Sequence, residues 1–420
     1  MKNEIHFIHT ADLHLDSPFL GLKHLPGELF ERIQNSTFLA FEKVIDEALN
    51  RNVDFIVIVG DLYDGEDRSI RAQAHLRQQM DRLNQAGIHA FLSHGNHDHL
   101  SGHWLNLDMP ANVHIFHKEV EWIPFTTRKG QKVHLYGFSY PTRHVRVRKI
   151  SEYKKEGEAD FHIGLLHGHC ESSRSKHQPY APFSIKELLQ TQMDYWALGH
   201  IHKAEVLHEN PYIVYPGNPQ GRHKNEEGEK MCCEVQINAA GQTKLTFIPT
   251  AVIRWESLAI PCVEGMNFTD LYLTCVNGME SMLAHKECGV LLEIILSNAS
   301  TLSTEIKEKI DNGEFLEMIQ AGLEMESPFI WPYKISKQKQ KTNPKAIQDP
   351  TFLNVIDQSI SDLLAGEELD ESLSPLFSHV YASRYLTPFD EKTKKQLLIG
   401  AKELIGDRLV VKMGGKINET

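Results

Sequence analysis

The sequence predicts a layered α/β protein, and two observations support that prediction. In the first half of the chain, short apolar runs alternate with longer stretches of helical periodicity. Each apolar run is followed within a few residues by a polar cluster that contains Asp, Asn or His. Strand–helix alternation is typical of an α/β domain, whose functional residues gather in loops at the carboxyl ends of strands. We therefore expect one site built from segments far apart in the sequence.

Five apolar runs have the length of buried strands. They are Ile5–His9, Val53–Val59, Ile88–Leu92, Phe161–Leu166 and Tyr195–Leu198. The stretches between the first three favour helices over Gly27–Asn50 and Ser69–Gln85, and Gly87 closes the second. Two further strand-like segments, Cys233–Ile237 and Leu245–Ile248, end the expected first domain, residues 1–250.

The second half of the chain predicts three smaller parts. A small α+β unit is expected over residues 251–333, with strand-like Leu271–Cys275 and Val290–Leu296 and a helical Ser303–Gly322. Residues 334–345 are rich in lysine and poor in apolar side chains, which is typical of an exposed linker. Residues 346–420 carry two patterns with apolar side chains on one helical face. The patterns are Phe352, Ile356, Ile360, Leu363 and Leu364, then Leu397, Leu398, Ala401, Leu404 and Ile405.

Composition sets further bounds. At 420 residues the chain is too long for one ordinary core. No apolar run reaches the roughly 18 residues of a membrane span, and the first residues lack the order of a secretory signal. The 6 cysteines are scattered without a CxxC pair, so we expect small buried side chains in a reducing cytoplasm.

Charge gives weak evidence about the partner, whereas histidine content is informative. The formal net charge of −12 argues mildly against a nucleic acid, because phosphate neutralisation requires Lys and Arg. Bound metal ions would, however, add positive charge where a phosphate sits. The 24 histidines are a rich supply of metal ligands and acid–base groups.

The polar clusters predict a metal centre. In chain order they are Asp12-Leu13-His14, Gly60-Asp61-Leu62-Tyr63-Asp64, Gly95-Asn96-His97-Asp98, His167-Gly168-His169 and Gly199-His200-Ile201-His202. Hard cations prefer oxygen ligands, whereas imidazole suits manganese, iron and zinc. A mixed set of Asp, Asn and His therefore suits a transition-metal pair better than calcium. One carboxylate can bridge such a pair, and the two ions can clamp the oxygens of a phosphate.

The ordered motifs DxH, GDxxD, GNHD, an isolated His after a strand, and GHxH resemble the calcineurin-like metallophosphoesterase family. The match covers Met1 to Gly221. The resemblance implies an α-β-β-α sandwich and a hydroxide that bridges two metal ions and attacks phosphorus. It also implies the metal ligands. Asp12, His14 and His202 would hold one ion, Asn96, His167 and His200 would hold the other, and Asp61 would bridge them.

The same resemblance implies that His97 is a general acid. It stands beside the ligand Asn96, and it would protonate the leaving oxygen rather than bind metal. In many members the last Asp of GDxxD pairs with this histidine, which here is Asp64. Such a carboxylate fixes the imidazole tautomer and raises its pKa, so that a proton remains available.

Other titratable residues near the motifs are expected to support the site or the fold. We expect packing or surface roles for His6 and His9, and loop or capping roles for Asp16 and Asp98. His169 is expected to support the ligands without binding metal. Supporting or substrate-contact roles are open for His94, His99 and His103.

The substrate is suggested by HTADLHLDSPF, GDLYD and Tyr215–Gln220, which resemble the DNA-repair exonuclease branch of SbcD-like enzymes and its YhaO-type members of Gram-positive bacteria. The resemblance implies a manganese-dependent nuclease, with iron or zinc as alternatives, and a capping domain. It also implies a helical C-terminal segment that docks on an SbcC-like (YhaN-type) coiled-coil ATPase, and a homodimer as one assembly. Some nuclease relatives carry His where this chain has Asp64.

Basic and aromatic residues give modest support for DNA. The stretch Arg143–Lys149 is basic, and four further cations lie in loops near the motifs: Arg174, Lys176, Arg222 and Lys224. Tyr140, Tyr180 or Trp104 could stack on a base. Three alternatives stay open: a phosphodiesterase for cyclic or small nucleotides, a protein phosphatase, and a non-catalytic scaffold subunit of an ATPase complex. The large second half argues against the first, missing arginine signatures against the second, and the complete ligand set against the third.

Overall fold

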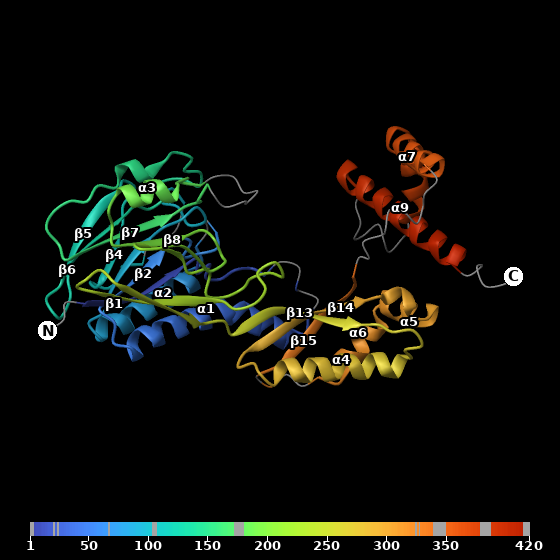
Figure 1. Cartoon of the computed structure of the whole chain (residues 1–420), viewed down its shortest axis with the longest axis horizontal. Helices are drawn as coiled ribbons and strands as arrows, with labels where there is room; N and C mark the ends of the chain where they lie inside the picture. Colours follow the sequence, from blue (N-terminus) through green and yellow to red (C-terminus); the bar gives the residue numbers. More distant parts are fainter. Residues whose placement is uncertain are drawn as a thin grey trace. The chain divides into compact units, whose positions relative to one another are not determined.

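The computed structural model describes residues 4–19, 22, 25–65, 68–102, 107–171, 180–323, 326, 328–338, 350–378 and 388–414. The chain divides into two compact units, Met1–Gln338 and Lys339–Thr420 (Figure 1).

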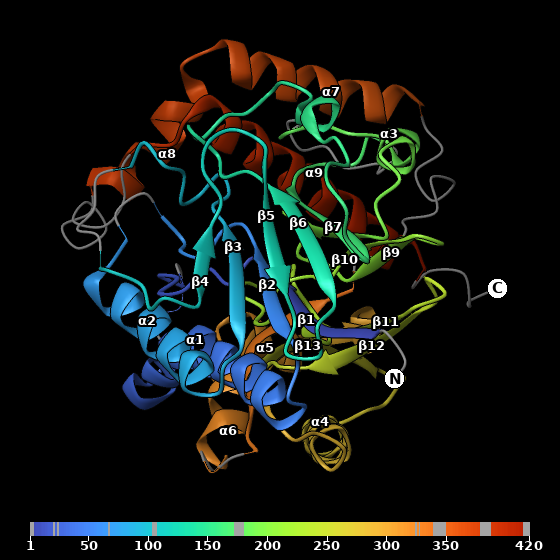
Figure 2. The same cartoon turned by 90° about the vertical axis from the view of Figure 1, so that its left-hand side faces the viewer.

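Two six-stranded sheets form the centre of the larger unit (Figure 2). The first has the order β12 (Thr243–Pro249), β11 (Met231–Asn238), β1 (Glu4–Ala11), β2 (Phe55–Val59), β3 (His89–Ser93) and β4 (Val113–Ile115). The second has the order β5 (Glu121–Thr126), β6 (Lys132–Gly137), β7 (Phe161–His167), β8 (Tyr195–Gly199), β10 (Tyr212–Tyr215) and β9 (Glu205–Glu209). The five predicted strands are β1, β2, β3, β7 and β8, and parallel pairs join them within each sheet.

The sheets pack face to face, and helices cover their outer faces. Between the sheets lies an apolar core in which Phe7 stacks on Phe55 at 4.8 Å between ring centroids and meets Tyr195 edge-on. Helices α1 (Gly27–Asn50) and α2 (Ile70–Gln85) cover the first sheet. The short helices η1 (Lys149–Glu152) and α3 (Ile185–Gln190) cover the second. The predicted α-β-β-α sandwich is confirmed.

The two long helices occupy the predicted segments. Buried side chains recur along α1 at helical spacing, which gives it one apolar face against the sheet. The hydroxyl of Ser69 accepts from the main-chain N–H of Ala72 and caps α2. Gly87, with φ of +67°, turns the chain after α2 into β3.

A three-stranded parallel sheet follows, with the order β13 (Ile253–Pro261), β14 (Gly289–Ser297) and β15 (Ile330–Lys337). The helix α4 (Phe268–Leu283) connects the first two strands. The short η2 (Ala299–Thr301), α5 (Thr304–Asp311) and α6 (Glu314–Ala321) connect the last two. In the small unit, which was expected to be α+β, helices therefore alternate with the strands of a parallel sheet.

Three expectations for this small unit are corrected. Leu271–Cys275, expected as a strand, lies within α4, whose capping box joins Asn267 to Asp270. The single helix expected over Ser303–Gly322 is broken into α5 and α6 at Gly313, whose φ is +92°. Residues 334–337 of the expected linker belong to β15, and its remaining residues, from 339, lie outside the described ones.

One face of the small sheet packs against the sandwich. Trp255, Leu291 and Trp331 from the small sheet form one buried cluster with Leu29 and Ile33 of α1. The opposite face packs on α4, α5 and α6. The small sheet is therefore buried on both faces within the larger unit.

The second unit contains α7 (Pro350–Ala365), α8 (Glu368–Ser378) and α9 (Glu391–Gly414). The first and last carry the two predicted patterns, whereas α8 was not predicted. Ion pairs join Asp357 of α7 to Lys402 of α9, and Asp370 of α8 to Lys394 of α9. Among the described segments, no helix is long and apolar enough to cross a membrane.

Candidate metal centre

Loops at the carboxyl ends of β1, β2, β3, β7 and β8 converge on one place, as the sequence predicts. The main-chain N–H of His14 donates to the Asp61 carbonyl at 2.9 Å, which joins the loops after β1 and β2. The carboxylate of Asp12 accepts from the main-chain N–H of His200 at 3.0 and 2.9 Å. The main-chain N–H of His97 donates to Asp61 Oδ1 at 2.9 Å. These bonds hold four of the five loops in one geometry.

Several site residues have a left-handed backbone. The φ angles are +53° at Asp12, +43° at His14, +47° at Asp61 and +97° at His200. Non-glycine residues rarely adopt this region, and each such position costs about 1–3 kcal/mol. Four occurrences in one cluster of candidate ligands indicate that the loops are shaped for the site rather than for stability.

Close approach explains the glycine before the GNHD asparagine. A Cβ on Gly95 would lie 2.2 Å from Asp61 Oδ1, and 2.8 Å from His167 Nε2. Only a residue without a side chain lets these two groups pack against the β3 loop.

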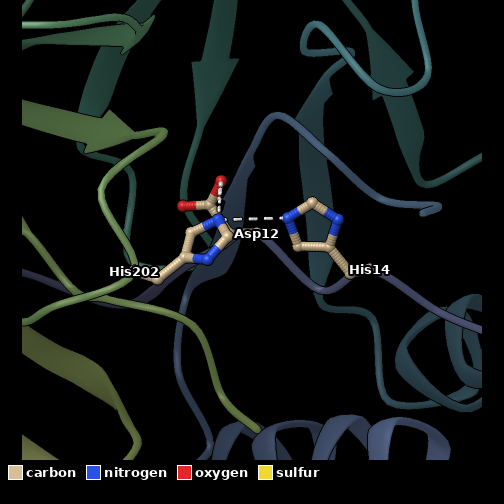
Figure 3. Close-up of side chains that lie close together, drawn as sticks. All are labelled: Asp12, His14 and His202. Carbon is tan, nitrogen blue, oxygen red and sulfur yellow. Dashed lines mark hydrogen bonds and ion pairs between the residues drawn. The ribbon is translucent and has the colours of Figure 1, made fainter. Parts of the chain in front are cut away.

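The first group of candidate ligands contains Asp12, His14 and His202, which point toward one another in Figure 3. The Nε2 atoms of His14 and His202 are 3.2 Å apart, and His202 Nε2 is 3.8 Å from Asp12 Oδ1. His202 Nδ1 donates to Glu226 Oε1 at 2.7 Å, which leaves the Nε2 lone pair directed at the group. Burial lowers the pKa of both histidines, so both imidazoles are neutral, the form that binds metal.

The second group contains Asp12, Asp61 and His167. His167 Nδ1 lies 3.2 Å from the Val59 carbonyl and donates to it, so Nε2 carries the lone pair. That Nε2 is 3.0 Å from Asn96 Oδ1 and 3.4 Å from Asp61 Oδ2. Asp61 Oδ2 is also 3.7 Å from His14 Nε2, so its carboxylate reaches both groups, as a bridging ligand would.

His200 lies at the edge of the second group. Its ring centroid is 5.2 Å from that of His167, and its main-chain N–H holds Asp12. Within the described segments, three groups of His and carboxylate atoms lie within 4.8 Å of one another, and His200 belongs to none of them. Six of the seven predicted ligands therefore lie close together: Asp12, His14, Asp61, Asn96, His167 and His202. The seventh, His200, lies farther from the others.

The residues present fit a pair of transition-metal ions. Burial and the neighbouring Asp61 carboxylate raise the pKa of Asp12 well above its usual range. Carboxylate oxygens, an amide oxygen and imidazole nitrogens converge here, and each of them can donate an electron pair to a cation. This mixture of oxygen and nitrogen donors is the one that manganese, iron or zinc accepts.

His97 is held differently from the expected pairing. Its Nδ1 lies 3.0 Å from the main-chain carbonyl of Asp64, not from the Asp64 carboxylate. A carbonyl only accepts, so Nδ1 carries a proton and Nε2 is the atom that can exchange one. The Asp64 carboxylate instead bonds Arg222, lies 3.1 Å from His14 Nδ1 and accepts from Ser17 Oγ at 3.3 Å.

Glu226 is the site residue that sequence reasoning missed. Besides His202, its carboxylate accepts from Asn218 Nδ2 at 2.9 Å and from the N–H of Arg222 at 2.8 Å. Burial disfavours the charged form of Glu226, but the hydrogen bond to His202 lowers the pKa of this carboxyl group. Glu226 is therefore ionised. The only available signal was an acidic pair, Glu226 and Glu227, shortly after the Tyr215–Gln220 segment, and the sequence does not say which of the two turns inward.

Asp98 and His9 have the structural roles expected of them. Asp98 accepts from the N–H groups of Leu62 at 3.0 Å and Gly95 at 2.7 Å, so one buried carboxylate joins the β2 and β3 loops. Burial opposes its ionisation, but His94 lowers the pKa of Asp98 to about 2. His9 is buried, with Nδ1 3.0 Å from Tyr195 Oη.

Of the basic and aromatic residues that could contact DNA, some are paired with carboxylates, one is buried, and some lie outside the described residues. Arg148 pairs with Glu171 and Glu187, and Lys149 with Glu119 and Glu152. Tyr140 is fully buried and donates to the His167 carbonyl, so the expectation that it could stack on a base is wrong. Three other candidates lie outside the described residues: Trp104, Arg174 and Lys176.

Comparison with known proteins agrees with this geometry. Residues 5–204 match the calcineurin-like phosphoesterase family model, a range that includes all five motif loops. The metallophosphoesterase YhaO of Bacillus subtilis is 36% identical over 419 residues, 98% of this chain and 99% of that protein.

More distant relatives are DNA double-strand break repair proteins named Mre11. That of Thermoplasma acidophilum is 26% identical over 232 residues, 52% of this chain and 57% of that protein. That of Methanosarcina mazei is 34% identical over 323 residues, 73% of this chain and 48% of that protein. The chain thus spans about half the length of these two relatives. Because the similarity to the Bacillus protein runs through both chains and the family match covers the site, the chain belongs to the calcineurin-like phosphoesterase family.

Proposed function

We propose that the chain is a metal-dependent phosphodiesterase that hydrolyses DNA phosphodiester bonds, as an SbcD-like exonuclease in DNA repair. The observation that carries the proposal is the convergence of carboxylate, amide and neutral imidazole ligands from five strand ends. Family membership supports phosphoester hydrolysis, and the names of the Mre11 relatives support DNA as the substrate.

In this proposal Asp12, His14 and His202 hold one ion, and Asn96, His167 and His200 hold the other. We propose manganese for both sites, with iron or zinc as alternatives. When bound, the ions would polarise the phosphoryl oxygens and make a water molecule nucleophilic near neutral pH. Asp61 lies between the two groups, and its carboxylate would bind both ions.

His97 would act as the general acid. The main-chain carbonyl of Asp64 accepts from His97 Nδ1, and the main-chain N–H of His97 donates to the Asp61 carboxylate. These two bonds hold the ring at the edge of the ligand set. Its Nε2 proton would pass to the oxygen that leaves phosphorus. Protonation stabilises an alkoxide leaving group, such as a deoxyribose oxygen, which is otherwise a poor one.

The remaining parts of the chain would serve DNA processing. Residues 251–333 would cap the substrate. The helices α7 to α9 would dock on a coiled-coil ATPase, because they expose apolar side chains such as Val355, Leu397 and Ile399. The six cysteines, all of them in described segments, are buried and unbridged, which supports a cytoplasmic location.

One assay separates the candidate functions. Purified chain with manganese is given labelled single- and double-stranded DNA, cyclic nucleotides and bis(p-nitrophenyl) phosphate. We expect DNA to be shortened and Asp61→Asn to abolish this. Cleavage of cyclic nucleotides without cleavage of DNA would favour the small-nucleotide phosphodiesterase instead. Bound metal without hydrolysis of any substrate would favour the scaffold subunit.

A further inference from the structure

Arg222 brings a guanidinium into the acidic side of the metal centre. It lies on the loop between β10 and β11, and its own N–H donates to Glu226 Oε2 at 2.8 Å. The neighbouring Gln220 donates to the Ile253 carbonyl at 2.6 Å, and the Gly221 carbonyl accepts from Trp255 Nε1 at 3.3 Å. These contacts fix the chain up to the N–H of Arg222, and this limits where its side chain can reach.

The guanidinium lies beside the residues that would handle the phosphate. Its Nη1 bonds the Asp64 carboxylate, the group that also lies 3.1 Å from His14 Nδ1. Its Nη2 is 3.5 Å from His202 Nδ1 and 3.8 Å from Glu226 Oε1. His97 is anchored on the main chain of the same Asp64, so Arg222 and His97 flank one edge of the ligand set.

The other cations near the site have different contacts. Lys230 Nζ donates to the His202 carbonyl at 3.0 Å, and Arg68 Nη2 donates to the Asp98 carbonyl. Arg222, in contrast, holds a side-chain carboxylate, and it does so through one end of a five-donor fork. A guanidinium matches the oxygens of a phosphate as well as those of a carboxylate. A phosphoryl group at the metal centre would thus compete with Asp64 for it.

We propose that Arg222 binds the substrate phosphate: paired with Asp64 in the free protein, its guanidinium turns to a non-bridging oxygen of a phosphoryl group held between the ligand set and His97. The inference rests on the proposed function, because it assigns the phosphate of that same site. It adds a positive charge that does not depend on pH to a centre rich in carboxylates.

The test is binding of inorganic phosphate to the manganese-loaded full chain, followed by calorimetry, with metal content measured on each sample. Arg222→Gln should weaken phosphate binding by about tenfold or more, the loss typical of a charged hydrogen bond. The matched control is Arg254→Gln. Arg254 has 12% side-chain exposure against 13% for Arg222, and it pairs with Glu229 at 3.0 Å outside the ligand groups. This control should bind phosphate as the unchanged chain does.

A double-mutant cycle separates direct binding from support through Asp64. If Arg222 contacts phosphate, Arg222→Gln weakens phosphate binding in an Asp64→Asn background as well. If it only positions Asp64, the loss disappears in that background, and the proposal is overturned. Equal affinity of Arg222→Gln and the unchanged chain at equal metal content overturns it too. If Arg222→Gln loses metal, Arg222→Lys is compared instead, and unchanged phosphate affinity there counts against the proposal.

The outcome is independent of whether DNA is the substrate. Phosphate binding that depends on Arg222, in a chain that cleaves no DNA, leaves the inference standing and rejects the nuclease. Phosphate binding that does not depend on Arg222, in a chain that cleaves DNA, rejects the inference and leaves the nuclease standing.

Discussion

At the scale of single residues, hydrogen bonds to carbonyls and carboxylates decide what each histidine can do. The Val59 carbonyl and Glu226 bind the Nδ1 atoms of His167 and His202, and so direct their Nε2 lone pairs toward the ligand set. The residue types of the proposed ligands could be read from the motifs. These partners could not, because a main-chain carbonyl leaves no mark in the sequence and Glu226 has an equally acidic neighbour.

The first prediction concerns His97. His97→Ala should leave metal content nearly unchanged and lower turnover by roughly a hundredfold or more, the range of general acids. The loss should shrink on bis(p-nitrophenyl) phosphate, because nitrophenolate leaves without a proton. Metal analysis with rates on DNA and on this diester provides the measurement. Equal losses on both substrates, or loss of metal, would show that His97 serves binding or structure instead.

The second prediction uses the adjacent pair Glu226 and Glu227. Glu226→Gln should weaken metal retention by about ten- to a hundredfold, because the carboxylate that orients His202 is lost. Glu227 is exposed, so Glu227→Gln is the matched control and should retain metal fully. Metal content after dialysis against a graded chelator series measures both. Similar retention in the two variants would mean that His202 does not need Glu226.

At the scale of elements, the first half was predictable because its strands and helices carry strong and different periodicities. Gly27–Asn50 is both the predicted and the observed helix α1. In the second half, Leu271–Cys275 has the apolar and β-branched character of a strand, but a capping box and burial of every fourth residue make it helical. Lys334 and Lys337 suggest a linker because lysines are typical of exposed chain. In the structure both belong to β15, and Lys334 bonds Glu293 at the surface of the small sheet.

A pair of leucines tests that helix. In a strand, Leu271 and Leu273 would share one face, whereas in α4 Leu271 is buried and Leu273 is 48% exposed. Leu271→Ala should therefore destabilise the small unit by about 2–5 kcal/mol, and Leu273→Ala should have little effect. Urea denaturation followed by the fluorescence of Trp255 and Trp331 measures the difference. Comparable destabilisation by both changes would support the strand.

At the scale of the whole molecule, the family model matches residues 5–204, which carry the candidate metal centre, whereas the similarity to the Bacillus relative extends over 98% of the chain. The convergence of five loops could be predicted from the sequence because parallel strands place their carboxyl ends at one edge. The loop that connects the metal centre to the small sheet could not, because its contacts join residues far apart in sequence, such as Gly221 and Trp255.

Truncation tests the proposed division of labour. A chain ending at Gln338 keeps β15 whole and removes the second unit. It should hydrolyse a small diester at the rate of the full chain but lose binding to a coiled-coil ATPase in a pull-down. Undiminished binding would place the docking surface in the larger unit. A truncation at Lys334 is the useful comparison, because cutting into β15 should lower stability as well.

The loop from Asn218 to Lys230 also offers a physical route by which metal affinity can be coupled to the packing of the small sheet. One end of it orients His202 through Glu226, and the other is bonded to Ile253 and Trp255 of β13. If metal binding tightens the packing of the small sheet by some factor, then tighter packing raises metal affinity by that same factor. With such a coupling, a partner that tightens the packing of the small sheet would make the centre hold its ions more firmly without contacting any ligand.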